Sequence, residues 1–191
     1  MITSGATTAK TTAKTPEFSD ILQLVEAAAA AEVPLVQLRE KSLSARVLYD
    51  LTTRAVEITR DTATRLLVND RFDIARAAGA HGVQLTERSL PANVVRRICG
   101  EDFLIGVSTH SLDTALKARA EGADFVVFGP VFETESKRAF GPPQGLEKLR
   151  EVTSALKGFP VLAIGGIDLD NVNDCFYAGA SGMAAIRLFN G

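Results

Sequence analysis

Three polar side chains alternate at the end of one short apolar run. Gln37, Arg39 and Lys41 lie in the segment LVQLREK, and the period of two in an extended strand places them on one side of the chain. A charge buried without a partner is costly, so packing alone does not explain two cations there. We expect these side chains to bind an anionic ligand. The alternative is a surface salt bridge with Glu40.

An amide and a carboxylate follow a second apolar run. Asn69 and Asp70 come directly after the residues LLV, and oxygen donors of this kind suit Mg2+. Asn and Asp are also favoured as helix N-caps, so the alternative is that one of them caps a helix over residues 71–78. Both interpretations stay open, with Asp70 as the candidate metal ligand.

Hydroxyl groups and one lysine supply the next candidates. The hydroxyl of Ser108 stands at the end of a third apolar run, in the segment Ser108-Thr109-His110. A lone histidine such as His110 is more often structural than catalytic. A loop as long as residues 129–145 is uncommon without a function. Within it, Thr134, Ser136 and Lys137 together can bind a phosphate or diphosphate; the alternative is a solvated, flexible loop.

Adjacent glycines complete the set of candidate ligand-binding residues. Gly165 and Gly166 follow a further apolar run, and glycines let backbone N–H groups approach an anion closely. Loops after the seventh and eighth strands are the common phosphate site of a (β/α)8 barrel. Cations, hydroxyls, a glycine turn and a carboxylate therefore predict a phosphorylated ligand, together with Mg2+.

The elements that must position these residues alternate between short apolar runs and longer helical segments. Such alternation predicts parallel strands with helices between them, either in an open doubly wound sheet or in a closed barrel. The count of eight favours a single-domain (β/α)8 TIM barrel over residues 1–191, lean and with a truncated last helix. The predicted strands lie near residues 1–4, 35–38, 66–68, 82–85, 103–108, 125–128, 161–164 and 183–186.

Local signals set the expected ends of these elements. Residues 5–17 are rich in Thr, Lys and Gly and predict a mobile loop, after which Ser19 or Asp20 is expected to cap the first helix. The phrases Ala-Gly-Ala and Glu-Gly-Ala recur around Gly79, Gly122 and Gly179. Each of these glycines is expected to end a helix in the left-handed conformation.

Composition excludes several classes of partner. With 46% hydrophobic and 23% charged residues, a formal net charge of -2 and no Trp, the chain has neither the global charge nor the aromatic residues typical of nucleic-acid or membrane binding. Cys99 and Cys175 predict buried free thiols in a reducing compartment, so we expect a cytoplasmic protein. We also expect a homo-oligomer, because a barrel without its eighth helix leaves an apolar strip uncovered.

The motifs, taken in order, resemble the thiamine phosphate synthase and thiazole tautomerase (TenI-like) superfamily from about residue 18 onward. They are VQLREK (residues 36–41), VND (68–70), IGVSTHS (105–111), GADFVVFGPVFETESK (122–137) and VLAIGGI (161–167). The resemblance implies a transferase that joins hydroxymethylpyrimidine diphosphate to thiazole phosphate and releases diphosphate. Catalysis would then rest on electrostatics and orientation.

The resemblance also implies a role for each candidate residue. Arg39, Lys41 and Lys137 would act on the diphosphate as catalytic residues, and Asp70 would bind Mg2+. Substrate binding would fall to the pyrimidine-side residues Gln37, Asn69 and Ser108 and to the thiazole-phosphate residues Thr134, Ser136, Gly165 and Gly166.

Two positions depart from the family patterns and keep three functions open. Ser89 stands where the synthase carries a second metal-ligand Asp, and only Glu87 is near enough in sequence to replace it. Pro130 stands where the tautomerases carry a catalytic His. The alternatives are a synthase, a tautomerase-like protein, and a non-catalytic binder of thiazole or thiamine phosphate. The intact residues on the diphosphate side favour the synthase.

Overall fold

The computed structural model describes residues 1–134, 142–186 and 188. The described chain divides into two units. Unit 1 comprises Met1–Gln84 and Asp102–Leu104 together with residue 186 onward, and unit 2 comprises Leu85–Glu101 and Ile105–Ala185. Each unit has its own parallel strands and its own helices.

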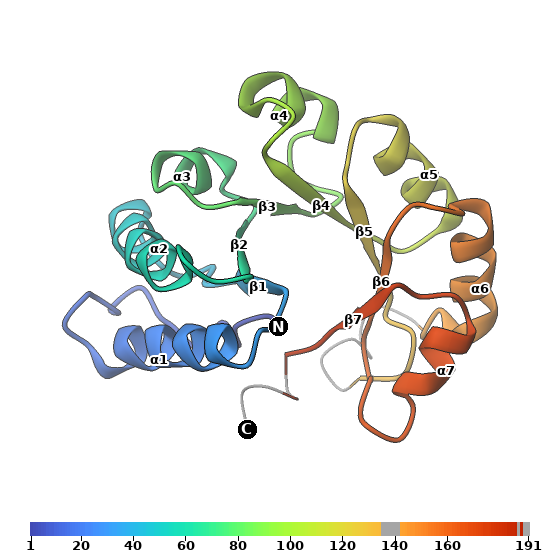
Figure 1. The fold of residues 1–191 in the computed structure, drawn as a ribbon, viewed down its shortest axis with the longest axis horizontal. Helices are drawn as coiled ribbons and strands as arrows, with labels where there is room; N and C mark the ends of the chain where they lie inside the picture. The colour runs from blue at the N-terminus through green and yellow to red at the C-terminus, as the bar shows by residue number, and fades with distance from the viewer. Residues whose placement is uncertain (135–141, 187, 189–191) are drawn as a thin grey trace. The chain divides into compact units, whose positions relative to one another are not determined.

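Unit 1 alternates helices and strands along the chain (Figure 1). Its elements are α1 (Pro16–Ala30), β1 (Leu35–Leu38), α2 (Ala45–Thr59), β2 (Arg65–Asn69), α3 (Phe72–Ala77) and β3 (Gly82–Leu85), whose last residue begins unit 2. β2 is parallel to β1 and also to β3. Because parallel strands end at the same edge of a sheet, Gln37 and Asn69 lie at one edge.

The N-terminal segment corrects two expectations. Residues 1–4 form no full strand: Ile2 makes an isolated parallel bridge to Gln37, and the N–H of Thr3 donates to the Gln37 carbonyl at 3.0 Å. The segment before α1 is also not a loose loop, since the side chains of Thr7 and Thr11 are buried. Threonine hydroxyls satisfy local backbone groups here, as in the 3.1 Å bond from the Thr8 N–H to Thr11 Oγ1.

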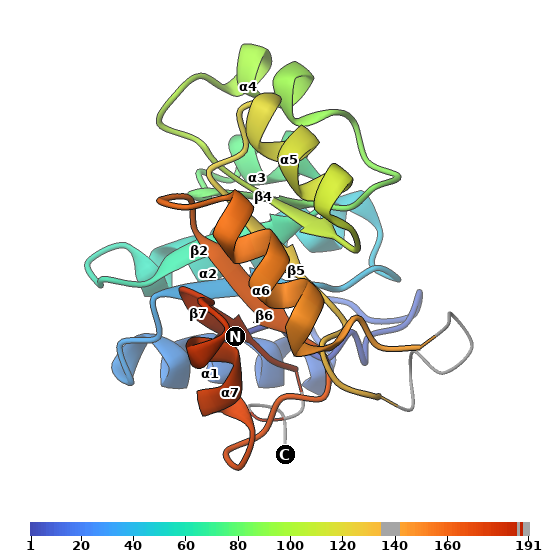
Figure 2. The same ribbon diagram turned by 90° about the vertical axis from the view of Figure 1, so that its right-hand side faces the viewer.

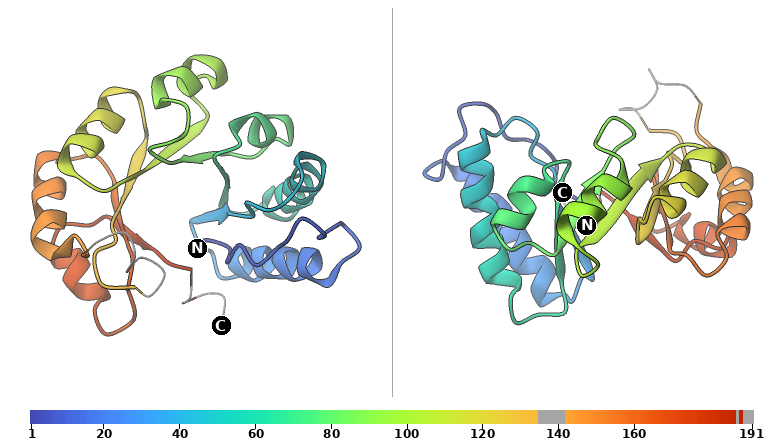
Figure 3. Two further views of the ribbon diagram at one scale, coloured as in Figure 1. Left: turned by 180° about the vertical axis from the view of Figure 1, so that it is seen from behind. Right: turned by 90° about the horizontal axis from the view of Figure 1, so that it is seen from above.

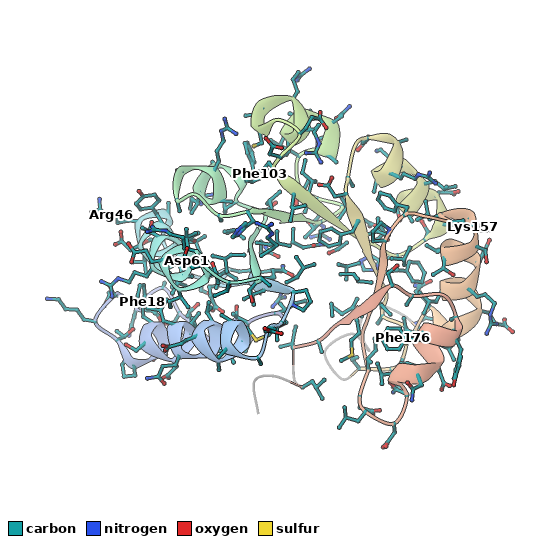
Figure 4. All side chains as sticks on the ribbon, viewed as in Figure 1. Phe18, Arg46, Asp61, Phe103, Lys157 and Phe176 are labelled. Atoms are coloured by element: carbon teal, nitrogen blue, oxygen red, sulfur yellow. The ribbon has the colours of Figure 1, made fainter. Side chains whose placement is uncertain are left out.

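The first helix starts earlier than the predicted cap. α1 begins at Pro16, after Thr15 at the N-cap, and no side chain caps it. Proline suits this position because its ring fixes φ and it lacks the N–H that the first turn would leave unpaired. Phe18 of α1 is buried (Figure 4). The guanidinium of Arg54, a residue of α2, lies 5.3 Å from the centre of the Phe18 ring.

Unit 2 continues the same alternation. Its elements are α4 (Ala92–Cys99), β4 (Leu104–Thr109, whose first residue belongs to unit 1), α5 (Leu112–Ala120), β5 (Phe125–Phe128), α6 (Gly145–Ala155), β6 (Val161–Ile164), α7 (Val172–Tyr177) and β7 (Gly182–Ala184). β4 to β7 pair in order, all parallel. α5, α6 and α7 line one side of these strands (Figures 2 and 3).

Several predicted helix ends are confirmed. Gly79, Gly122 and Gly179 follow α3, α5 and α7 with φ of 77°, 87° and 92°, so each takes the left-handed conformation that glycine tolerates. Ser111 caps α5 in a capping box with Thr114. Cys99 and Cys175 are free and buried, as predicted.

The architecture is therefore a parallel α/β fold with seven strands in the described residues. The predicted first strand is reduced to the bridge at Ile2, because only one residue of that segment pairs in register with β1. Within the described part of the chain, each helix is too short or too polar to cross a membrane.

Candidate active site

Unit 1 brings together two of the predicted ligand-binding residues. Gln37 is only 7% exposed, and its Nε2 donates to Oδ1 of Asn69 at 3.1 Å. β1 and β2 lie in parallel register with Gln37 opposite Leu67, which sets the two amides side by side near the carboxyl ends of the strands. Because the Asn69 oxygen accepts from Gln37, the Asn69 NH2 group faces away from Gln37 as a hydrogen-bond donor.

The cations beside this pair differ in their exposure. Arg39 is half-buried and Lys41 is exposed. Arg39 forms no ion pair with Glu40, so that part of the salt-bridge alternative is not observed. Glu40 is instead buried, at 3% exposure, and its carboxylate accepts hydrogen bonds from Thr3, Gly5 and Thr7.

Asp70 has the backbone of a turn residue rather than of a helix cap. Its φ is 63°, and its N–H donates to the Gln84 carbonyl at 2.9 Å. The N-cap of α3 is Arg71, without a side-chain cap bond, so the capping alternative is not observed. Asp70 is exposed and forms no ion pair within the described residues.

The guanidinium of Arg71, the residue after Asp70, is hydrogen-bonded to Asp73. Nε and Nη2 of Arg71 donate to the two carboxylate oxygens of Asp73 at 2.8 and 2.6 Å. This hydrogen bonding raises the pKa of Arg71 and lowers the pKa of Asp73. Arg71 also interacts electrostatically with Asp70, but among the described residues its guanidinium forms its ion pair with Asp73.

The donor set around Asp70 fits Mg2+ that is shared with a phosphorylated ligand. Mg2+ is commonly held by one or two carboxylates and by substrate phosphates rather than by a complete protein cage. In the described residues there is no group of three or more His, Cys, Asp or Glu placed to hold a metal by themselves. An exposed carboxylate beside the Asn69 amide matches the first arrangement.

In unit 2, His110 fastens the start of the loop after β5. Its Nδ1 forms a hydrogen bond with the Gly129 carbonyl, while the Gly129 N–H donates to the Thr109 carbonyl at 3.3 Å. These bonds favour the structural interpretation of His110. Ser108, the candidate pyrimidine contact, is half-buried two residues earlier at the end of β4.

Gly165 and Gly166 form a turn against which this loop packs. Their φ angles are 100° and 66°, and a Cβ on Gly165 would lie 2.5 Å from Cβ of Pro130. The N–H of Phe132 donates to the Gly165 carbonyl at 2.9 Å. Among the described residues, the N–H groups of Gly166 and Ile167 have no acceptor. Such paired donors suit an anion.

The remaining candidates of the loop are only partly described. Thr134 is half-buried in the loop after β5, and Ser136 and Lys137 lie outside the described residues. Ser89 has a structural contact: its Oγ accepts from the Thr86 N–H at 2.8 Å and lies 3.0 Å from Thr86 Oγ1. Serine at this position therefore closes the turn after β3.

Sequence reasoning missed one buried charge and one anchor. Sequence spacing offers Glu40 only its cationic neighbours as partners, because the threonines that bind it lie more than thirty residues away in the chain. Gln84 is 3% exposed, and its carbonyl holds the Asp70 N–H. Nothing in the local sequence indicates that cross-strand bond.

Comparisons with known proteins place the chain in a family. A family model described as thiamine monophosphate synthase matches residues 10–189. A thiamine-phosphate synthase of Methanoculleus marisnigri is 45% identical over 168 residues, which are 88% of this chain and 79% of that protein. A thiamine-phosphate synthase of Moorella thermoacetica is 42% identical over 170 residues, 89% of this chain and 80% of that protein.

A solved structure with a related name also matches this chain. The thiamine phosphate pyrophosphorylase from Pyrococcus furiosus matches with a TM-score of 0.78 and 34% sequence identity, covering 86% of this chain and 78% of that one. A 3-hexulose-6-phosphate synthase, at 18% identity and a TM-score of 0.63, shares the fold alone. The family model and both curated relatives lead to one conclusion: this chain is a member of the thiamine monophosphate synthase family.

Proposed function

We propose that the chain is a thiamine phosphate synthase, which joins hydroxymethylpyrimidine diphosphate to thiazole phosphate and releases diphosphate. Family membership and relatives with this name support the reaction. The observation that carries it is the Gln37–Asn69 contact next to the half-buried Arg39 and the exposed Asp70. Amide, cation and carboxylate at adjacent strand ends match a ligand that carries both a polar ring and a diphosphate.

The proposal divides the candidate residues between the two substrates. Gln37, Asn69 and Ser108 would orient the pyrimidine, while Arg39, Lys41 and Lys137 neutralise its diphosphate. Thr134, Ser136 and the Gly165-Gly166 backbone would hold the thiazole phosphate. The N–H groups of Gly166 and Ile167, which have no acceptor among the described residues, support the last assignment, because backbone donors at a glycine turn bind phosphate oxygens well.

The chemistry asks mainly for charge neutralisation and orientation. The bond from the pyrimidine methylene carbon to the diphosphate oxygen breaks, its electron pair leaves with diphosphate, and the thiazole nitrogen forms the new bond to that carbon. Cations around the diphosphate stabilise the developing negative charge. Mg2+, held by Asp70, would supply further neutralisation of the leaving group.

The proposal also includes a single barrel domain and a cytoplasmic location. One eight-stranded barrel domain over residues 1–191 is supported by the TM-score of 0.78 to the Pyrococcus furiosus protein. A cytoplasmic location is supported by the two free thiols, Cys99 and Cys175, which suit a reducing compartment.

Product formation tests the proposed reaction. Purified protein is incubated with both substrates and Mg2+, and thiamine phosphate is measured as fluorescent thiochrome. Lys137→Ala should lower the rate about 100-fold or more, because removing a charge-assisted contact to a leaving group is costly in the transition state. Lys157→Ala, which removes an exposed lysine after α6, is the matched control and should keep the wild-type rate.

Two results would overturn the proposal. One is the absence of product with intact wild-type protein and substrates. The other is an equal loss of rate in both lysine variants, which would assign the effect to general charge rather than to Lys137.

A further inference from the structure

Glu40 is a buried carboxylate whose neighbours in sequence are both cations. It is 3% exposed, yet it does not pair with Arg39. Its Oε1 accepts from Thr3 Oγ1 at 2.6 Å and from the Gly5 N–H at 3.2 Å, and its Oε2 accepts from Thr7 Oγ1 at 2.7 Å and the Thr7 N–H at 3.4 Å. Four neutral donors therefore satisfy a charge that would otherwise be costly to bury.

One hydroxyl links this carboxylate to the backbone of Arg39. Thr3 Oγ1 donates to Glu40 and accepts from the Arg39 N–H at 2.8 Å. A hydroxyl has one proton and two acceptor lone pairs, so with its proton directed at Glu40 its oxygen can accept from the Arg39 N–H. The Glu40 carboxylate thus fixes the orientation of the Thr3 hydroxyl, and the hydroxyl fixes the peptide of Arg39.

The same segment reaches the Arg39 side chain. Gly5 has φ of 75°, and a Cβ added to it would lie 3.1 Å from the Arg39 carbonyl oxygen and 3.3 Å from Nη1. The backbone at Gly5 therefore borders the guanidinium while its N–H is held by Glu40. The segment that Glu40 holds therefore bonds the Arg39 peptide and lies beside its guanidinium.

We propose that Glu40 is a positioning residue, which holds residues 3–7 so that the Arg39 guanidinium is kept in place for the diphosphate group. This inference rests on the proposed function, because Arg39 has this ligand only if the chain binds the pyrimidine diphosphate. It adds Thr3 and Thr7 to the residues on which that site depends.

The charge of Glu40 and its positioning role predict opposite effects of Glu40→Gln on diphosphate binding. A carboxylate next to an anion-binding arginine repels the anion, so Glu40→Gln should tighten diphosphate binding if charge alone matters. The positioning role predicts weaker binding instead, because glutamine replaces one carboxylate oxygen with an NH2 group, which cannot accept from the two donors that this oxygen holds.

The experiment is calorimetric titration of inorganic diphosphate with Mg2+ into the full chain. Glu40→Gln and Thr3→Val should each weaken binding about fivefold or more, the loss expected for one misplaced charged contact. Thr11→Val is the matched control: Thr11 is a buried threonine of the same segment, bonded to the Thr8 N–H rather than to Glu40. It should bind diphosphate as the wild type does.

Steady-state kinetics separate positioning from general damage. Thr3→Val should raise KM for the pyrimidine diphosphate and leave KM for the thiazole phosphate unchanged, and its effect on diphosphate binding should vanish in an Arg39→Ala background. Diphosphate binding by Glu40→Gln or Thr3→Val that equals or exceeds the wild type would overturn the inference. If the wild type neither binds diphosphate nor forms product, the proposed function itself fails and the inference falls with it.

Discussion

His81, directly before β3, accepts a hydrogen bond that depends on pH. Its Nδ1 accepts from the Leu66 N–H at 3.0 Å, which requires the neutral ring. Burial, and secondarily the charge of Arg65, lowers the pKa of His81 below the ordinary 6.5. Below pH 6.5 the unfolded chain therefore binds more protons at this residue than the folded chain does.

We predict that His81 makes stability fall as the pH drops below about 6.5 toward its folded pKa. Its contribution is complete above that value. His81→Asn keeps an acceptor oxygen but does not titrate, so its urea midpoint should change less between pH 7.5 and 5.5. Parallel pH dependence in the two proteins would contradict this account.

Thr109 contains the one buried side-chain polar atom left unpaired in the described residues. Its side chain is 0% exposed, and its Oγ1 has no partner. A buried hydroxyl without a hydrogen bond lowers stability. We predict that Thr109→Val raises the free energy of unfolding by about 1 kcal/mol, measured by urea denaturation. A loss of stability would show that the hydroxyl has a partner in solution.

At the scale of elements, the loop after β5 depends on glycine for its path. A Cβ on Gly129 would lie 2.0 Å from the Ile164 carbonyl oxygen, which is held by the Val131 N–H at 2.8 Å. Gly129→Ala should therefore destabilise the protein by about 3 kcal/mol. It should also raise KM for the thiazole phosphate, because it displaces the segment leading to Thr134.

The matched control for this substitution is Gly158→Ala. Gly158 has φ of 81° and open space around the position of a Cβ, so alanine there costs only backbone strain, about 1 kcal/mol. Denaturation midpoints compare the two variants. Equal losses at both positions would argue against the close approach of Gly129 to β6.

Elements with strong local signals could be predicted from the sequence. The strands from β1 to β7 are short apolar runs, and the glycines after α3, α5 and α7 end those helices as expected. The N-terminal segment could not be predicted, because its order comes from Glu40, which lies more than thirty residues away in sequence. Local composition made residues 5–17 resemble a loose loop.

At the scale of the whole molecule, the kind of ligand was easier to predict from the sequence than the hydrogen-bond partners of the site residues. The types of Gln37 and Asn69 pointed to a ligand, and the structure pairs them. The backbone bond from Asp70 to Gln84 and the side-chain bond from Arg71 to Asp73 depend on three-dimensional geometry that sequence spacing does not specify. Homo-oligomer formation stays a prediction, and a monomer in light scattering at micromolar concentration would contradict it.

The most direct test of the central claim is the rate of thiamine phosphate formation as Mg2+ is titrated, in the wild type and in Asp70→Asn. The account predicts metal-dependent product in the wild type. In the variant, the Mg2+ concentration for half-maximal rate should rise about tenfold or more, because the substituted amide lacks the charge that holds the ion. Absence of product in the wild type, or an unchanged metal dependence in Asp70→Asn, would contradict the account.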